Sequence, residues 1–274
     1  MNHTPITRHL PLCAALLAAL ATPLLQAAPK AQPMVLNGPT AVLSQSSPSG
    51  TAQVTVDGAG SFMEALVYTT ADDDTYDMSY KSGMYFDGAL YGVESVKQSQ
   101  GNKAKSSYVV GSLQVDLKQA LTLGAVAGSY QLKQVYTLTN PGTEPVSVNL
   151  MRYNDSDVGD YGYQPAGGRF SYVVSTATPS PESLTRYVGI QLTGGANTMR
   201  VVRYCCDNLN DITPEENNTV ADDLDGDGVS EASWDKAINN QTTVVVPAGG
   251  SAKVHTVTLF GRSALGSLSA LPAR

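Results

Sequence analysis

The chain has 274 residues, of which 42% are hydrophobic and 15% charged, and its formal net charge is −7 at pH 7. This length buries enough surface for a substantial core, either as one large β domain or as two small ones. The acidic balance repels nucleic acid and anionic lipid, so neither is an expected partner.

The first segment has the order of a secretory signal peptide. Arg8 precedes an apolar run over 10–25, and small residues follow at Ala27 and Ala28. The run is short for a membrane span, so we predict a signal peptide over 1–27 and no membrane insertion. Its removal takes away one basic and no acidic residue, which leaves a net charge of −8 on a secreted or periplasmic protein.

The rest of the chain shows strand patterns. Residues 28–50 are rich in Pro, Ser and Gln and are predicted to form a leader with at most one short strand. From 51 to 264, alternating or apolar runs are separated by Gly and Pro turns, and 265–274 forms a tail. We predict an all-β fold, a large antiparallel β-sandwich or supersandwich. Its strands are expected near 54–56, 62–69, 84–93, 108–117, 130–139, 145–153, 170–174, 187–192, 199–204, 242–246 and 252–260.

The clearest predicted hairpin joins 130–139 to 145–153. Asn140, Pro141 and Gly142 lie between these two runs, and this combination is a strong turn signal. The hairpin would carry the residues after 153 to one end of the sandwich.

Two segments also fit a helix. Over 115–123 the apolar residues have a spacing that suits either a strand or a helix, whereas over 230–239 Trp234 and Ile238 are four residues apart. We predict one short helix, over 230–239, directly after an acidic loop.

That loop, over 223–234, resembles an EF-hand-type or dockerin-type calcium loop. Three aspartates occupy alternate positions 1, 3 and 5, and Gly228 follows at position 6, where the chain must turn sharply. Trp234 stands at position 12, where the resemblance calls for a bidentate Glu; the alternative is a solvated Asp/Gly loop. The predicted cofactor is Ca²⁺, with ligands from Asp223, Asp225, Asp227, the Val229 carbonyl and Glu231.

A second acidic loop follows the predicted hairpin. Carboxylates there could accept sugar hydroxyls or share a cation, and a Tyr ring could stack on a sugar face. Acid clusters also occur in plain turns, because Asp and Asn cap their own backbones. The ligand-binding residues predicted here are Tyr153, Asp155, Asp157, Tyr161 and Tyr163.

Cys205 and Cys206 are adjacent, and Cys13 lies in the predicted signal peptide. Neighbouring Cα atoms are about 3.8 Å apart, below the usual range for a disulfide. Unpaired thiols are unfavourable in an oxidising compartment. We predict a disulfide between the two residues; the alternative is two thiols on opposite faces of a strand end.

No catalytic residue is assigned from the sequence. His255 is the only histidine after the predicted signal peptide, and no nucleophile-elbow, zinc-protease, P-loop or dinucleotide motif is present. The first hypothesis is therefore a secreted, calcium-stabilised sandwich that binds carbohydrate or a cell-surface ligand. The alternatives are a polysaccharide-processing enzyme, either a lyase or a glycoside hydrolase, and a structural envelope or matrix protein.

Overall fold

The computed structural model describes residues 38–70, 73–78, 81–156, 158, 161–163, 170–175, 184–205, 211–230, 232 and 235–264. Over these residues the chain is all-β, with 17 strands and no helix. No helix in this part of the chain has the length and apolar character needed to cross a bilayer. The predicted signal peptide and tail lie outside the described residues.

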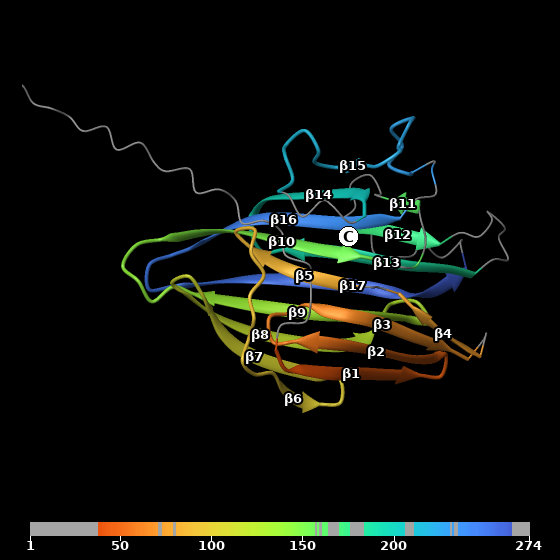
Figure 1. Ribbon diagram of the computed structural model, residues 1–274, viewed down its shortest axis with the longest axis horizontal. Coiled ribbons are helices and arrows are strands. Elements are labelled where there is room, and N and C mark those ends of the chain that lie inside the picture. The colour runs from red at the N-terminus through yellow and green to blue at the C-terminus, as the bar shows by residue number, and fades with distance from the viewer. Residues whose placement is uncertain are drawn as a thin grey trace, which may run out of the picture.

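The strands form two sheets, which appear as two stacked layers in Figure 1. The nine-stranded sheet contains, in spatial order, β1 (Thr40–Ser47), β2 (Gly50–Asp57), β3 (Phe62–Thr69), β5 (Lys81–Phe86), β10 (Val146–Asp155), β16 (Lys236–Val246), β14 (Ala196–Tyr204) and β15 (Thr219–Val220), with β4 (Asp74–Asp77) beside β3. The eight-stranded sheet contains β11 (Tyr161–Tyr163), β12 (Ser171–Ser175), β13 (Leu184–Thr193), β17 (Ser251–Ala264), β9 (Ser129–Thr139), β8 (Leu113–Leu123), β7 (Lys103–Val110) and β6 (Lys97–Gln100). Neighbouring strands are antiparallel except β14 and β15, which are parallel.

The core lies between the facing sides of the two sheets. Alternation along the strands places every second residue inward, as in β8, where Leu113, Val115 and Leu117 are buried and the intervening residues are exposed. The main cluster combines residues of both sheets, among them Leu43, Val54 and Phe62 from one and Leu121, Leu132 and Phe260 from the other. Each sheet therefore buries its apolar face against the other.

The hairpin predicted for 130–139 and 145–153 is wrong. β9 pairs with β8 and β17, whereas β10 pairs with β5 and β16 in the other sheet. The turn between them therefore crosses from one sheet to the other, beside a second crossing between β16 and β17. The two crossings bind each other, because Asn140 N donates to Gly250 O (3.0 Å) and Gly249 N donates to Gly142 O (2.9 Å).

The short helix predicted over 230–239 is also wrong. Its last four residues open β16, which pairs with β10 on one side and β14 on the other. Hydrogen bonds to two neighbouring strands and burial of Ala237, Ile238 and Asn239 favour the extended backbone over a helix. The ambiguous segment 115–123 is likewise a strand, within β8.

β1 falls inside the segment predicted as a leader. It pairs over eight residues with β2, and its Ala41 and Leu43 belong to the main core cluster. Thr40–Ser47 is therefore part of the sheet.

Two buried charged residues lie inside the fold, near the turn from β2 to β3. Asp57 is 1% exposed, and its Oδ1 accepts hydrogen bonds from Ala59 N and Ser61 N, each at 2.9 Å. Arg152 is fully buried, and its Nη1 donates to Gly60 O at 2.8 Å. Burial raises the pKa of Asp57 to about 6, although the amides of this turn and the charge of Arg152 oppose the rise.

Candidate functional site

The acidic loop lies between β15 and β16, at one end of the nine-stranded sheet. Oxygens of Asp223, Asp225 and Asp227 all lie within 4.8 Å of one another. Asp223 is half-buried, whereas Asp225 and Asp227 are exposed. Convergent carboxylates of this kind provide the hard oxygen ligands that Ca²⁺ and Mg²⁺ prefer.

The loop backbone folds around these carboxylates. Asp223 Oδ1 accepts from Gly226 N (2.7 Å) and its Oδ2 from Gly228 N (2.9 Å), while Asp227 Oδ1 accepts from Val229 N (2.8 Å). Gly226 and Gly228 have φ of 81° and 85°, which L side chains rarely adopt. The two glycines thus allow the sharp turns that bring the three aspartates together.

Both ends of the loop are tied to the sheet through Asp222. Its Oδ2 accepts from Lys236 Nζ at 3.0 Å, and its other oxygen accepts from the Tyr204 hydroxyl. These bonds, first from Tyr204 and then from Lys236, lower the pKa of Asp222. Lys236 is fully buried, opens β16 and has its ammonium 4.7 Å from the centre of the Tyr204 ring. The pair therefore joins the residue before the loop to the strand after it.

This anchor was not found from the sequence. Asp222 is one of several acids in its segment, and Lys236 falls within the helix predicted over 230–239. The available signal in the sequence was that Lys236 directly precedes the apolar residues Ala237 and Ile238, which suggests burial. A buried lysine requires a carboxylate partner.

The structure places only part of the predicted calcium-ligand set. The three aspartates come together, and Val229 follows directly, half-buried. Glu231 and Trp234 lie outside the described residues. The assignment of Ca²⁺ to this loop stays a prediction.

Tyr153 and Asp155 lie near the end of β10, on the side opposite the main core. They are 2% and 3% exposed, and Tyr153 packs with Tyr85, Met151 and Ala237 in a separate small cluster. Burial raises the pKa of the Tyr153 hydroxyl, and the charge of Asp155 adds to this effect. The Tyr153 ring has no open face on which a sugar could stack.

The other predicted ligand-binding residues follow the same strand. Asp157 lies outside the described residues, whereas Tyr161 and Tyr163 form the two ends of β11. Ser230 N donates to Gly162 O at 3.0 Å, which links β11 to the end of the acidic loop. A Cβ at Gly162 would lie 2.6 Å from Val202 Cγ1, so glycine permits β11 to pack closely against β14. The two segments that the sequence predicts as separate sites therefore contact each other at this end of the molecule.

A third acidic group lies close by. One oxygen each of Asp155 and Asp235 and the Cys205 sulfur lie within 4.8 Å of one another. Cys205 is disulfide-bonded, so it offers no thiolate to a metal. What remains is a pair of carboxylates, one buried and one exposed. Cys206 lies outside the described residues.

The cysteines give a direct prediction. We expect the intact mass of the purified protein to be two hydrogens below that of the dithiol form, and no thiol to react with an alkylating reagent before reduction. Mass spectrometry with and without reductant measures both quantities. Two alkylated cysteines in unreduced, freshly purified protein would contradict a disulfide between Cys205 and Cys206.

No protein-family model and no curated protein matches this chain. Solved structures with a similar arrangement include an inverting family GH92 mannosidase from Bacteroides thetaiotaomicron VPI-5482, which is 10% identical, covers 79% of this chain and has a TM-score of 0.37. A protein from Synechocystis sp. PCC 6803 is 8% identical, with 85% of this chain and 99% of its own covered and a TM-score of 0.39. A 4-alpha-glucanotransferase from Thermococcus litoralis is 7% identical, with 82% of this chain and 40% of its own covered and a TM-score of 0.37. This chain spans 27% of the mannosidase, and no activity follows from likenesses this weak.

Proposed function

We propose that this chain is an exported β-sandwich protein that is stabilised by calcium and binds carbohydrate or another extracellular ligand without converting it. The observation that carries the proposal is the convergence of the Asp223, Asp225 and Asp227 carboxylates on a loop anchored to the sheet. The predicted signal peptide supports export, and the absence of an assembled catalytic motif from the sequence supports binding over chemistry.

The position of the loop supports a ligand site there. Loops at the end of a rigid sheet are where such folds usually carry function. Ca²⁺ takes six to eight oxygen ligands, so three aspartates leave positions that other groups of the loop, water or ligand hydroxyls can fill. β11 brings Tyr161 and Tyr163 to this end, and phenols offer both an apolar ring and a hydrogen-bonding tip.

A second candidate function is polysaccharide cleavage, and it depends on the carboxylate pair of Asp155 and Asp235. Retaining glycoside hydrolases use two carboxyl groups about 5–5.5 Å apart. Oxygens of Asp155 and Asp235 lie within 4.8 Å of each other, and the two side chains differ in burial, a difference that can separate acid and base roles. A substrate would reach Asp235 first, because Asp155 is 3% exposed.

A panel of soluble polysaccharides tests the proposal, with binding and product formation measured with and without EDTA. We expect Asp157→Ala and Tyr161→Ala each to reduce binding while the melting temperature changes by only a few degrees. Glu144→Ala is the matched control, since Glu144 is an exposed acid in the crossing after β9.

The outcomes separate the hypotheses. Binding that survives both substitutions, or unfolding of both variants, would remove the ligand site from this loop. New sugar chain ends, formed by the wild type and lost in Asp235→Ala, would favour the enzyme. A protein that neither binds nor cleaves any member of the panel would favour a structural role.

A further inference from the structure

Lysines gather on the solvent side of the eight-stranded sheet. The chain has nine lysines, and six of them are exposed on β6, β7, β8, β9 and β17: Lys97, Lys103, Lys105, Lys118, Lys133 and Lys253. Only one acidic residue, Asp116, occurs in these five strands. On a chain with a net charge of −7, this surface has the opposite sign to the whole.

Three of these lysines stand directly opposite one another. In the strand register Lys97 pairs with Lys105, and Lys105 pairs with Lys118. Side chains directly opposite on one face have Cβ atoms about 4.5–5.5 Å apart, and like charges at such positions destabilise a sheet. None of the three forms an ion pair with any residue that the structure describes. The fold does not require this row, because any polar side chain would suit a solvent-facing position.

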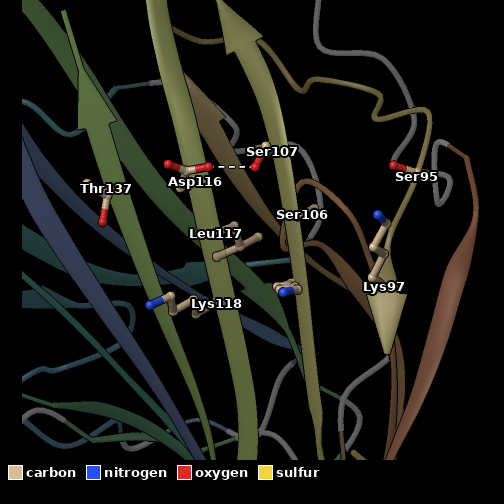
Figure 2. A pocket seen from close by; sticks show the side chains of 9 residues that line it. Ser95, Lys97, Ser106, Ser107, Asp116, Leu117, Lys118 and Thr137 are labelled. Atoms are coloured by element: carbon tan, nitrogen blue, oxygen red, sulfur yellow. Dashed lines mark hydrogen bonds between the residues drawn. The ribbon is translucent and has the colours of Figure 1, made fainter. Parts of the chain in front are cut away.

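The row borders a hollow of about 470 Å³. Figure 2 shows Lys97 on one side of it and Lys118 on the other, with Asp116 next to Ser107 further along the same strands. Ser107 Oγ donates to Asp116 at 2.5 Å. The other polar groups that line the hollow are Ser95, Lys105, Ser106 and Thr137.

We propose that this hollow and its lysine row bind an acidic polysaccharide, through carboxylate or sulfate groups that lie between the lysines. Three uncompensated ammonium groups would gain the counter-charges that they lack. The hydroxyls of Ser95 and Thr137 and the carboxylate of Asp116 match a sugar, which offers hydroxyl donors beside its anionic groups.

Other polyanions fit less well. The phosphodiester backbone of DNA offers acceptors and no hydroxyl donor to Asp116, and duplex DNA carries one charge per about 1.7 Å. No aromatic ring is among the described residues that line the hollow, so bases have nothing on which to stack. An acidic polysaccharide combines anionic groups with hydroxyl donors, which is the pattern that the hollow presents.

This site is separate from the acidic loop. The loop follows β15, at the edge of the nine-stranded sheet, whereas the lysine row lies on β6, β7 and β8 of the other sheet. Binding at the row therefore does not require calcium. We expect it to persist in EDTA and in Asp225→Ala, so its failure and the failure of the proposed function are distinguishable.

The test compares wild type with the double variant Lys105→Gln/Lys118→Gln in EDTA. The probes are alginate, which is carboxylated, dextran sulfate, which is sulfated, and neutral dextran. We expect the affinity of the wild type for one or both acidic probes to fall roughly tenfold in the double variant, to fall with added salt, and to be retained by Lys105→Arg/Lys118→Arg. Neutral dextran should not bind at this site.

A stability measurement separates loss of binding from misfolding. Removal of two members of a like-charged row should leave the melting temperature unchanged or raise it by about one to two degrees. Equal affinity of wild type and double variant for both acidic probes would overturn the proposal. So would stronger binding to single-stranded DNA or to phosphatidylserine vesicles than to either acidic polysaccharide.

Discussion

Replacement of Asp57 by asparagine is expected to raise the free energy of unfolding at pH 7 by about 3 kcal/mol. Burial raises the pKa of Asp57 from its ordinary value of 3.8 to about 6 in the folded chain. At about 1.4 kcal/mol per pKa unit, this difference in pKa gives the expected rise in the free energy of unfolding. The reason is that asparagine is neutral, so no negative charge has to be buried at this position. Its side-chain oxygen can still accept from Ala59 N and Ser61 N.

The pH dependence gives this prediction its sign. The folded chain binds the Asp57 proton more tightly than the unfolded chain, so the favourable contribution of this group is complete below about pH 4. It is lost as the pH rises from 3.8 through about 6. Denaturant unfolding of wild type and Asp57→Asn should therefore converge near pH 3.5 and differ most above pH 7.

The exposed Asp74→Asn is the matched control for the loss of one carboxylate outside the core. An Asp57→Asn variant that is less stable than wild type at every pH would contradict the prediction. That result would mean that Arg152, whose Nε and Nη2 have no hydrogen-bond partner among the described residues, depends on the Asp57 charge.

The class of fold was predictable because alternation is a local signal. Leu113, Val115 and Leu117 reveal a half-buried strand without reference to any partner. Which strands pair was not predictable, since a Pro and Gly turn after residue 139 serves a hairpin and a sheet crossing equally well. The difference lies in contacts of β9 with β17 and of β10 with β16, more than 80 residues away along the chain.

The site was predictable to the same extent. Alternating aspartates and Gly228 act within a few residues, and their convergence follows from local geometry. Asp222 and Lys236 depend on the placement of β16 beside β14, and nothing local marks Asp222 as the carboxylate that Lys236 contacts. The lysine row results from the register in which the strands pair. Lys97, Lys105 and Lys118 show no pattern in the sequence and become neighbours only through strand pairing.

Removal of calcium is expected to lower the melting temperature of the wild type by about 5–10 °C. A ligand that binds only the folded chain adds about 2.7 kcal/mol of stability at a hundredfold excess over its dissociation constant. For a domain of this size, each kcal/mol corresponds to about 2–4 °C. Calorimetry with added Ca²⁺ measures the binding of the ion, and thermal melts with and without EDTA measure its effect on stability. Asp225→Ala should abolish the response to EDTA, whereas Glu144→Ala should keep it.

The order of stabilities in EDTA separates a metal site from a solvated loop. Without a cation, the carboxylates of Asp223, Asp225 and Asp227 repel one another, because their oxygens lie within 4.8 Å. Removal of one carboxylate should then reduce this repulsion and stabilise the fold. Asp225→Ala should therefore melt at or above the wild type in EDTA and below it in calcium. A merely solvated loop would show no such reversal: wild type and variant would keep the same order in both conditions, and calorimetry would detect no bound calcium. That result would remove Ca²⁺ from the proposed function and leave the lysine row untouched.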